Sequence, residues 1–124
     1  MENQEIEQTL LGKLIVEPEL IDKFEKLLHI DLFYYDFHRS IYNSICKLKS
    51  RGQEIDILTI SRLIKGGDEK NISYELSIIT EQAFSFTEVI TCIGILTEEF
   101  QKRTLTSIVQ GVHNQLSNRD ELEL

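Results

Sequence analysis

The chain of 124 residues has room for one compact domain and little else. Its hydrophobic content of 41% is that of an ordinary folded domain, which excludes disorder of the whole chain. With 21 acidic and 13 basic residues it has a formal net charge of -8, which argues against a domain that grips nucleic acid through its phosphates, because such domains present a basic surface.

The two cysteines and the N-terminal segment indicate in which cellular compartment the protein works. Cys46 and Cys92 are too few and too far apart for a disulfide scaffold or a zinc site, so we expect two buried free thiols. Residues 1–5 are acidic and polar, unlike a secretory signal or a transit peptide. No apolar run approaches the roughly 18 residues that a membrane span needs. We therefore expect a cytoplasmic protein that meets no membrane.

Apolar residues recur at spacings of three and four from the start of the chain, which is typical of helices with one buried face. This spacing predicts a helix over residues 5–16. Pro18 ends that helix and suits the first turn of a second helix, where its missing N–H has no partner to lose. The buried face of the second helix is expected to extend from Leu20 to Leu28 and to include Leu27.

The third helix is predicted to begin near Asp36, whose side chain could cap the first free N–H groups. It should end at Gly52, which follows a basic last turn. Its inward residues are expected at Ile41, Tyr42 and Ile45, at helical spacing.

Two short helices are predicted to follow. Asp56 is a good N-cap for the first, which carries Leu58 among its apolar residues. Glycines at 66 and 67 break it, and the second is predicted over residues 73–82 with Tyr74 turned inward.

The last element is predicted to be a single long helix. No proline and no paired glycines interrupt residues 86–116, where apolar residues recur mostly every three to five positions. A helix of about 30 residues is about 45 Å long, which exceeds the roughly 26 Å diameter of a domain of this size. Part of it should therefore project, and its exposed apolar residues need a partner, most simply a second copy. We expect the self-association seam to consist of Val89, Ile93, Leu96, Phe100, Ile108 and Val112.

The alternative for each of the six seam residues, and above all for Val89 to Phe100, is burial against the head of the same chain. No stretch alternates with period two long enough to propose a sheet. The predicted organisation is thus all-α, with a helical head over residues 1–84 and a long helix over 85–117. A cap-like Ser/Asn/Asp cluster suggests that residues 118–124 begin a further helix.

A search for catalytic or cofactor-binding patterns finds none. A phosphate-binding P-loop needs an upstream glycine before its Gly-Lys pair, and Gly12-Lys13 lies inside a helical pattern without one. The histidines at 29, 38 and 113 lack the spacing of a helical metal site, and no nucleophile-elbow pattern is present. We therefore expect no enzymatic activity, no metal and no cofactor in this chain.

A group of aromatic residues between the second and third helices would suit the stacking of nucleic-acid bases. The neighbouring residues are the carboxylates Asp31 and Asp36 rather than a basic groove, so we expect core packing instead. The group consists of Phe33, Tyr34, Tyr35, Phe37 and Tyr42.

The order of short motifs resembles the N-terminal domain of replicative DNA helicases of the DnaB type. Each motif is weak alone, but they occur in the family's order over roughly residues 5–110. They are EQTLLGKLI at 7–15, DLFY at 31–34, HRSIY at 38–42, GQEIDILTISRLI at 52–64, the helix around Tyr74, and ILTEEFQKR at 95–103, which ends in Arg103.

This resemblance implies an all-helical head followed by a helical hairpin, with the long helix as its first arm. It implies a non-catalytic collar domain whose hairpins pair within a hexamer, and which offers a docking surface to primase and a helicase loader. ATP and Mg²⁺ are implied for the motor domain of the parent helicase, which this chain lacks. We accordingly expect the chain to be one domain of a longer ATP-dependent DNA helicase.

The sequence departs from the family pattern in places. Gln53-Glu54 stands where the family usually has a proline before its Ile-Asp turn, and residues 83–88 lack the usual proline and asparagine. These differences leave the details of hairpin pairing open and suggest a divergent, phage-related or mobile-element helicase. The alternative is a stand-alone adaptor or inhibitor that resembles the helicase-binding domain of primase; a small enzyme is the third possibility.

Overall fold

The computed structural model describes the backbone of residues 3–64 and 66–123 and the side chains up to Asn118. These described residues form helices and turns without a strand, as predicted. The elements are α1 (Gln4–Val16), α2 (Glu19–Lys23), η1 (Ile30–Leu32), α3 (Asp36–Ser50), α4 (Ile57–Leu63), α5 (Glu69–Glu81), η2 (Gln82–Phe84) and α6 (Val89–Glu123).

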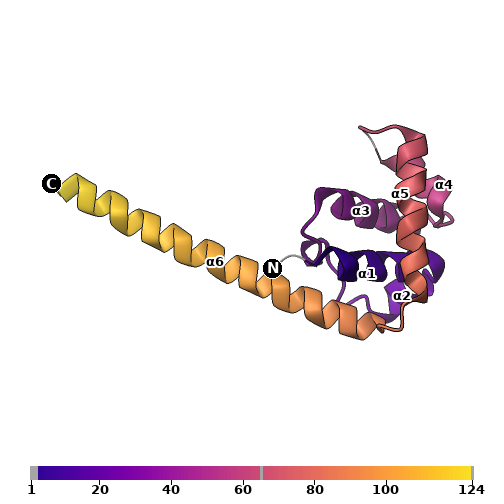
Figure 1. Ribbon diagram of the computed structural model, residues 1–124, viewed down its shortest axis with the longest axis horizontal. Helices are drawn as coiled ribbons and strands as arrows, with labels where there is room; N and C mark the ends of the chain where they lie inside the picture. Colours follow the sequence, from indigo (N-terminus) through magenta and orange to yellow (C-terminus); the bar gives the residue numbers. More distant parts are fainter. Residues whose placement is uncertain (1–2, 65, 124) are drawn as a thin grey trace.

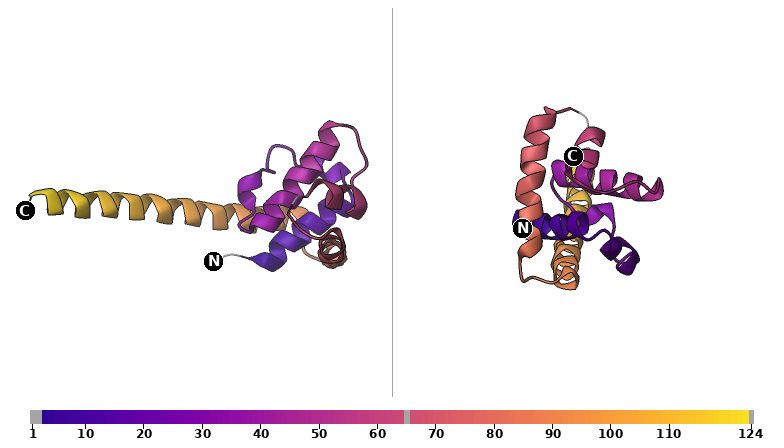
Figure 2. Two further views of the ribbon diagram at one scale, coloured as in Figure 1. Left: turned by 90° about the horizontal axis from the view of Figure 1, so that it is seen from above. Right: turned by 90° about the vertical axis from the view of Figure 1, so that its right-hand side faces the viewer.

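Helix α1 is the centre of the head, because it packs against α2, α3, α5, η2 and the start of α6. Its leucines Leu10, Leu11 and Leu14 have no exposed surface. Around them the other helices place one apolar face each, and together these faces form a single hydrophobic core. Figure 1 shows α6 leaving this head and extending far beyond it, and from above it remains nearly straight (Figure 2).

Local signals explain several boundaries. Asp56 caps α4: its side chain accepts from the N–H of Thr59, whose hydroxyl in turn accepts from the N–H of Asp56. Gly52 follows α3 with a positive φ of 65°, the left-handed conformation in which glycine has no steric penalty. Both features agree with the sequence-based expectation.

Other boundaries differ from prediction. Helix α2 ends at Lys23, and Leu27 lies in the turn that follows, 46% exposed. Tyr35 rather than Asp36 occupies the N-cap position of α3. Helix α5 begins at Glu69, four residues before the predicted start at residue 73. Asp68 caps this helix, because its side chain accepts a hydrogen bond from the N–H of Lys70.

Two residues predicted to face inward are exposed instead. Tyr74 on α5 is 67% exposed, and Leu58 on α4 is 50% exposed. Each helix buries only one narrow face, through Leu76 and Ile79 in α5 and through Ile60 in α4. A small head with several short helices leaves the flanking apolar positions in solvent.

Helix α6 is continuous through the position where a further helix was expected to begin. Ser117 and Asn118 lie inside α6, which extends from Val89 to Glu123. Neither residue type stops a helix unless the backbone turns there, and no glycine or proline is present at this point to favour such a turn. The two leucines of the expected helix, Leu122 and Leu124, lie outside the described side chains.

Among the described residues, no single helix is long and apolar enough to cross a membrane. Residues 69–84 and 89–118 together would be long and apolar enough for a membrane span. The chain bends by 115° between these two segments.

Candidate functional site

The structure divides the predicted seam on α6 into two groups. Val89, Ile93 and Leu96 are at most 8% exposed and belong to the core of the head. Their side chains are covered by the same chain, so they cannot also form the contact face for a second copy. For these three residues, burial against the head replaces the expected role in self-association.

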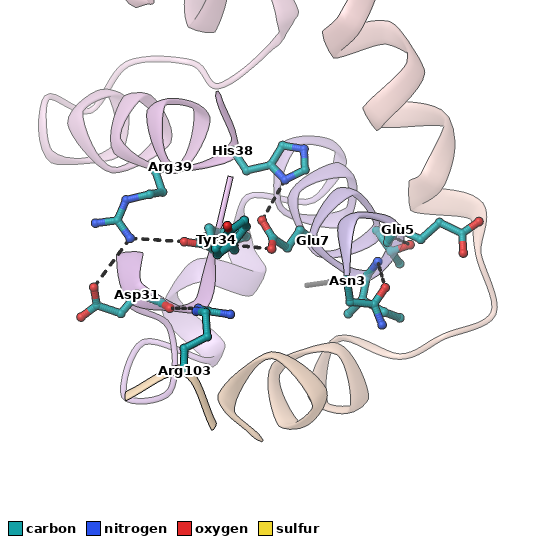
Figure 3. A network of polar contacts seen from close by, with 11 residues as sticks. Asn3, Glu5, Glu7, Asp31, Tyr34, His38, Arg39 and Arg103 are labelled. Atoms are coloured by element: carbon teal, nitrogen blue, oxygen red, sulfur yellow. Dashed lines mark hydrogen bonds and ion pairs between the residues drawn. The ribbon is translucent and has the colours of Figure 1, made fainter. Parts of the chain in front are cut away.

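Phe100 and Arg103 lie where α6 leaves the head. Figure 3 shows Arg103 beside Asp31. The ring of Phe100 meets His29 edge to face, with ring centroids 5.7 Å apart. The guanidinium of Arg103 donates to the backbone carbonyl of Asp31 at 3.0 Å and lies 5.4 Å from the ring centroid of Tyr34. These contacts attach the last packed turn of α6 to the segment around η1.

Beyond Arg103, every described residue of α6 is exposed. We call residues 104–118 the projecting segment. At 1.5 Å per residue it is about 22 Å long. It contains Ile108 and Val112, the two remaining seam residues, which are 58% and 51% exposed.

Three further apolar residues, Leu105, Val109 and Leu116, are also exposed on the projecting segment and were not included in the predicted seam. With 100° of rotation per residue, they share one face of about 100° with Ile108 and Val112. Helical spacing alone could have identified them, since 105, 109, 112 and 116 follow at steps of four, three and four. We call these five residues the outer stripe.

The projecting segment also lacks formal charge. From Thr104 to Asn118 the sequence contains no Asp, Glu, Lys or Arg. Serine, threonine, asparagine, glutamine and glycine occupy much of the face opposite the outer stripe. A helix that stays in water normally carries charges on its polar face, so this composition is typical of a helix covered within an assembly.

A buried polar cluster joins α1 to the start of α3 (Figure 3). Glu7 has no exposed surface and His38 is 3% exposed, and Glu7 Oε1 lies 2.8 Å from His38 Nδ1. Glu7 Oε2 accepts a hydrogen bond from the N–H of Tyr34 at 3.1 Å. Three residues from separate motifs thus meet in one contact, which holds the η1 segment against α1.

The Gly12-Lys13 pair also has a structural explanation. A Cβ at position 12 would overlap the carbonyl oxygen of Ile79, so α1 and α5 can approach this closely only at a glycine. Lys13 Nζ donates to the carbonyls of Ala83 and Ser85, at 3.1 and 2.8 Å. Lys13 therefore holds the segment between η2 and α6 against α1.

The two cysteines occupy different environments. Cys92 is fully buried, and burial raises the pKa of its thiol, with Lys13 lowering it in part. Cys46 is only half-buried, beside Tyr42, whose own pKa is raised by burial and by the neighbouring thiol. In the described part of the chain, no group of three or more His, Cys, Asp or Glu side chains is arranged to hold a metal ion.

A protein-family model described as the DnaB-like helicase N terminal domain matches residues 1–98, which is most of the chain. The chain belongs to this family. The replicative DNA helicase DnaB of a Nostoc species is 25% identical over 112 residues, covering 84% of this chain and 12% of that protein. The replicative DNA helicase DnaC of Bacillus subtilis is 30% identical over 84 residues, covering 68% and 18%. The chain spans about a quarter or less of the curated relatives that it matches.

Solved structures share the fold. The N-terminal domain of DnaB helicase from Mycobacterium tuberculosis superposes with a TM-score of 0.78 at 19% identity, covering 91% of this chain and 83% of that one. A structure describing a DnaB-like replicative helicase and its interactions with primase has a TM-score of 0.76 at 27% identity, covering 93% and 28%. The resemblance of the sequence motifs to DnaB-type N-terminal domains is thereby confirmed, as is the all-α fold.

Proposed function

We propose that this chain is a non-catalytic collar domain of a hexameric replicative DNA helicase. The outer stripe carries this proposal, because five exposed apolar residues on an uncharged projecting helix need a protein surface to cover them. In this proposal the projecting segment of one copy packs against that of a second copy, and each segment is the first arm of a helical hairpin. Three such pairs would build the collar of the hexamer.

The same domain would dock primase and a helicase loader. The support is the family together with the described interactions of two relatives: the DnaB-like helicase above and the N-terminal domain of Helicobacter pylori DnaB helicase, which was solved with its interactions with primase. ATP and Mg²⁺ would act in a separate motor domain of the parent protein. With its net charge of -8, this domain would not hold DNA strongly by itself.

The self-association part is tested by light scattering of the purified chain at high concentration. The wild type should form dimers or larger species, and Ile108→Asp or Val112→Asp should shift it to the monomer, because a carboxylate cannot stay unpaired in an apolar contact. Ser107→Asp and Asn114→Asp add the same charge on the opposite face and serve as matched controls. A wild type that stays monomeric, or controls that dissociate equally, would contradict pairing through the outer stripe.

The stand-alone adaptor remains the competing function. The reading frame that encodes the chain separates the two: continuation into a Walker A motif supports the helicase, and a stop codon directly after residue 124 supports the adaptor. For primase docking, the measurement is co-elution of the chain with the primase encoded by the same genome, with Ile108→Asp included to separate docking from self-association.

A further inference from the structure

A pocket of about 440 Å³ opens on the head between α1, the start of α3 and the first turns of α5. No residue of α6 lines it, so it is independent of the outer stripe. Besides Gly67 and Ile72, the residues that line it carry aromatic rings or groups that can accept a hydrogen bond, and no described Lys or Arg is among them.

His38 also lines the pocket, and only 3% of its surface is exposed. Its Nδ1 faces Glu7 Oε1 at 2.8 Å. Glu7 Oε2 accepts from the N–H of Tyr34, and both oxygens of Glu7 act as acceptors when the imidazole proton is on Nδ1, so we assign that tautomer to His38. In this tautomer the lone pair lies on Nε2, which Figure 3 shows on the side of the ring away from Glu7.

Nε2 makes no hydrogen bond to the described residues. An acceptor that faces a pocket can take its hydrogen bond from water or from a ligand. The carboxylates of Asp68 and Glu75 and the amides of Gln8 and Asn71 also line this pocket. Together these groups select a ligand that donates several hydrogen bonds and carries positive charge.

The helix ends near the pocket do not favour an anion instead. The first turn of α5 is capped by Asp68, which accepts from the N–H of Lys70, and the first turn of α1 is capped by Asn3, which accepts from the N–H of Ile6. Their free N–H groups are thus already partly used, and by a carboxylate in the case of α5.

We propose that this pocket takes an arginine side chain presented by a partner protein. A guanidinium carries five N–H donors in one plane, matching the carboxylates, amide oxygens and Nε2 around the pocket, and its faces can stack on Tyr35 and Phe37. A partner segment can extend along α5, because the lining residues from Asp68 to Glu75 follow two turns of that helix. The negative charge of the chain would attract a basic segment.

The experiment is a titration of the ¹⁵N-labelled chain with N-acetyl-arginine amide, followed by NMR. Saturable shifts should appear at Tyr35, His38 and Asn71. N-acetyl-citrulline amide, which has nearly the same shape without the charge, should bind much more weakly. Equal binding of the citrulline compound would overturn the proposal. So would free arginine binding more tightly than the capped form, since that would indicate a site for the amino acid rather than for a partner.

Variants test whether the pocket itself is responsible. Asp68→Asn keeps an N-capping residue on α5 while removing the charge, and Glu75→Gln changes an exposed residue. Each should raise the dissociation constant about two- to fivefold, the range expected for an exposed charge pair. Glu81→Gln makes the same charge change on α5 outside the pocket and should have no effect. If Glu75→Gln and Glu81→Gln bind equally well, the proposal fails.

Discussion

The two parts of α6 show how similar apolar spacing can serve different ends. Val89, Ile93 and Leu96 face α1 and the rest of the head and are at most 8% exposed. From Leu105 to Leu116 similar residues at similar spacing are more than half exposed. The spacing defines a face, but only the position of the head determines whether the same chain covers it. The packed part should therefore govern stability, and the projecting part association.

The largest expected effect is that of Leu96→Asp in the packed part. Leu96 is 1% exposed, so the substitution would bury a carboxylate in the core and cost about 4 kcal/mol or more. That is comparable to the whole stability of a small domain. Circular dichroism should show loss of cooperative unfolding, whereas Ile108→Asp should keep the wild-type melting curve. Similar melting curves for both variants would contradict the view that the packed part of α6 governs stability and the projecting part does not.

Glu7→Ala should be the next most destabilising change. It would leave the N–H of Tyr34 and Nδ1 of His38 without a partner inside the head. Loss of one partner from a buried polar cluster costs about 3 kcal/mol. Urea unfolding followed by circular dichroism measures the change, with the exposed Glu5→Ala in the same helix as its control.

Gly12→Ala should destabilise the head by about 2 kcal/mol, because the added methyl group overlaps the Ile79 carbonyl and forces α1 and α5 apart. Gly94→Ala provides the matched control on α6, since no atom lies within 4 Å of the added carbon there. That variant should gain up to about 1 kcal/mol from helix propensity. Equal effects of the two changes would show that close approach is not what Gly12 provides.

Arg103→Ala should act on the junction more than on the head. It removes the contacts to the Asp31 carbonyl and to the Tyr34 ring at the surface, worth about 1 kcal/mol. We expect faster amide hydrogen exchange in residues 99–106 with little change in the melting temperature of the head. Lys102→Ala, which removes an exposed pair with Glu98, should leave the exchange of this turn unchanged.

The smallest effect is expected for Gly111→Ala in the projecting segment, where nothing lies near the added carbon. Better helix propensity should stabilise this segment by about 1 kcal/mol and slow its amide exchange. The melting temperature of the head should not move. A coupled rise in both would indicate that the projecting segment and the head unfold as one unit.

Local signals in the sequence predicted those features that depend on neighbouring residues. The Asp56 cap and the Gly52 terminus of α3 were predicted because each acts within about one helical turn. The Glu7–His38 contact was not predicted, since its partners are 31 positions apart. The start of α5 was misplaced because the Asp68 cap was not recognised before an otherwise polar first turn.

The candidate site was predicted in the same partial way. Ile108 and Val112 were placed on an exposed face correctly, but Val89, Ile93 and Leu96 were grouped with them because all share helical spacing. The pocket between α1, α3 and α5 was not foreseen, since its residues come from three segments that the fold brings together.

The sequence by itself determined the helical class, the presence of one long last helix, the uncharged composition of its projecting segment and the motif order that marks the family. These follow from spacing, capping and composition, which act locally along the chain. Only the tertiary structure decided where the head ends on α6, why Glu7, Gly12 and Arg103 lie where they do, and which apolar residues stay exposed. Burial depends on which surfaces meet in space, and residues distant in the sequence supply those surfaces.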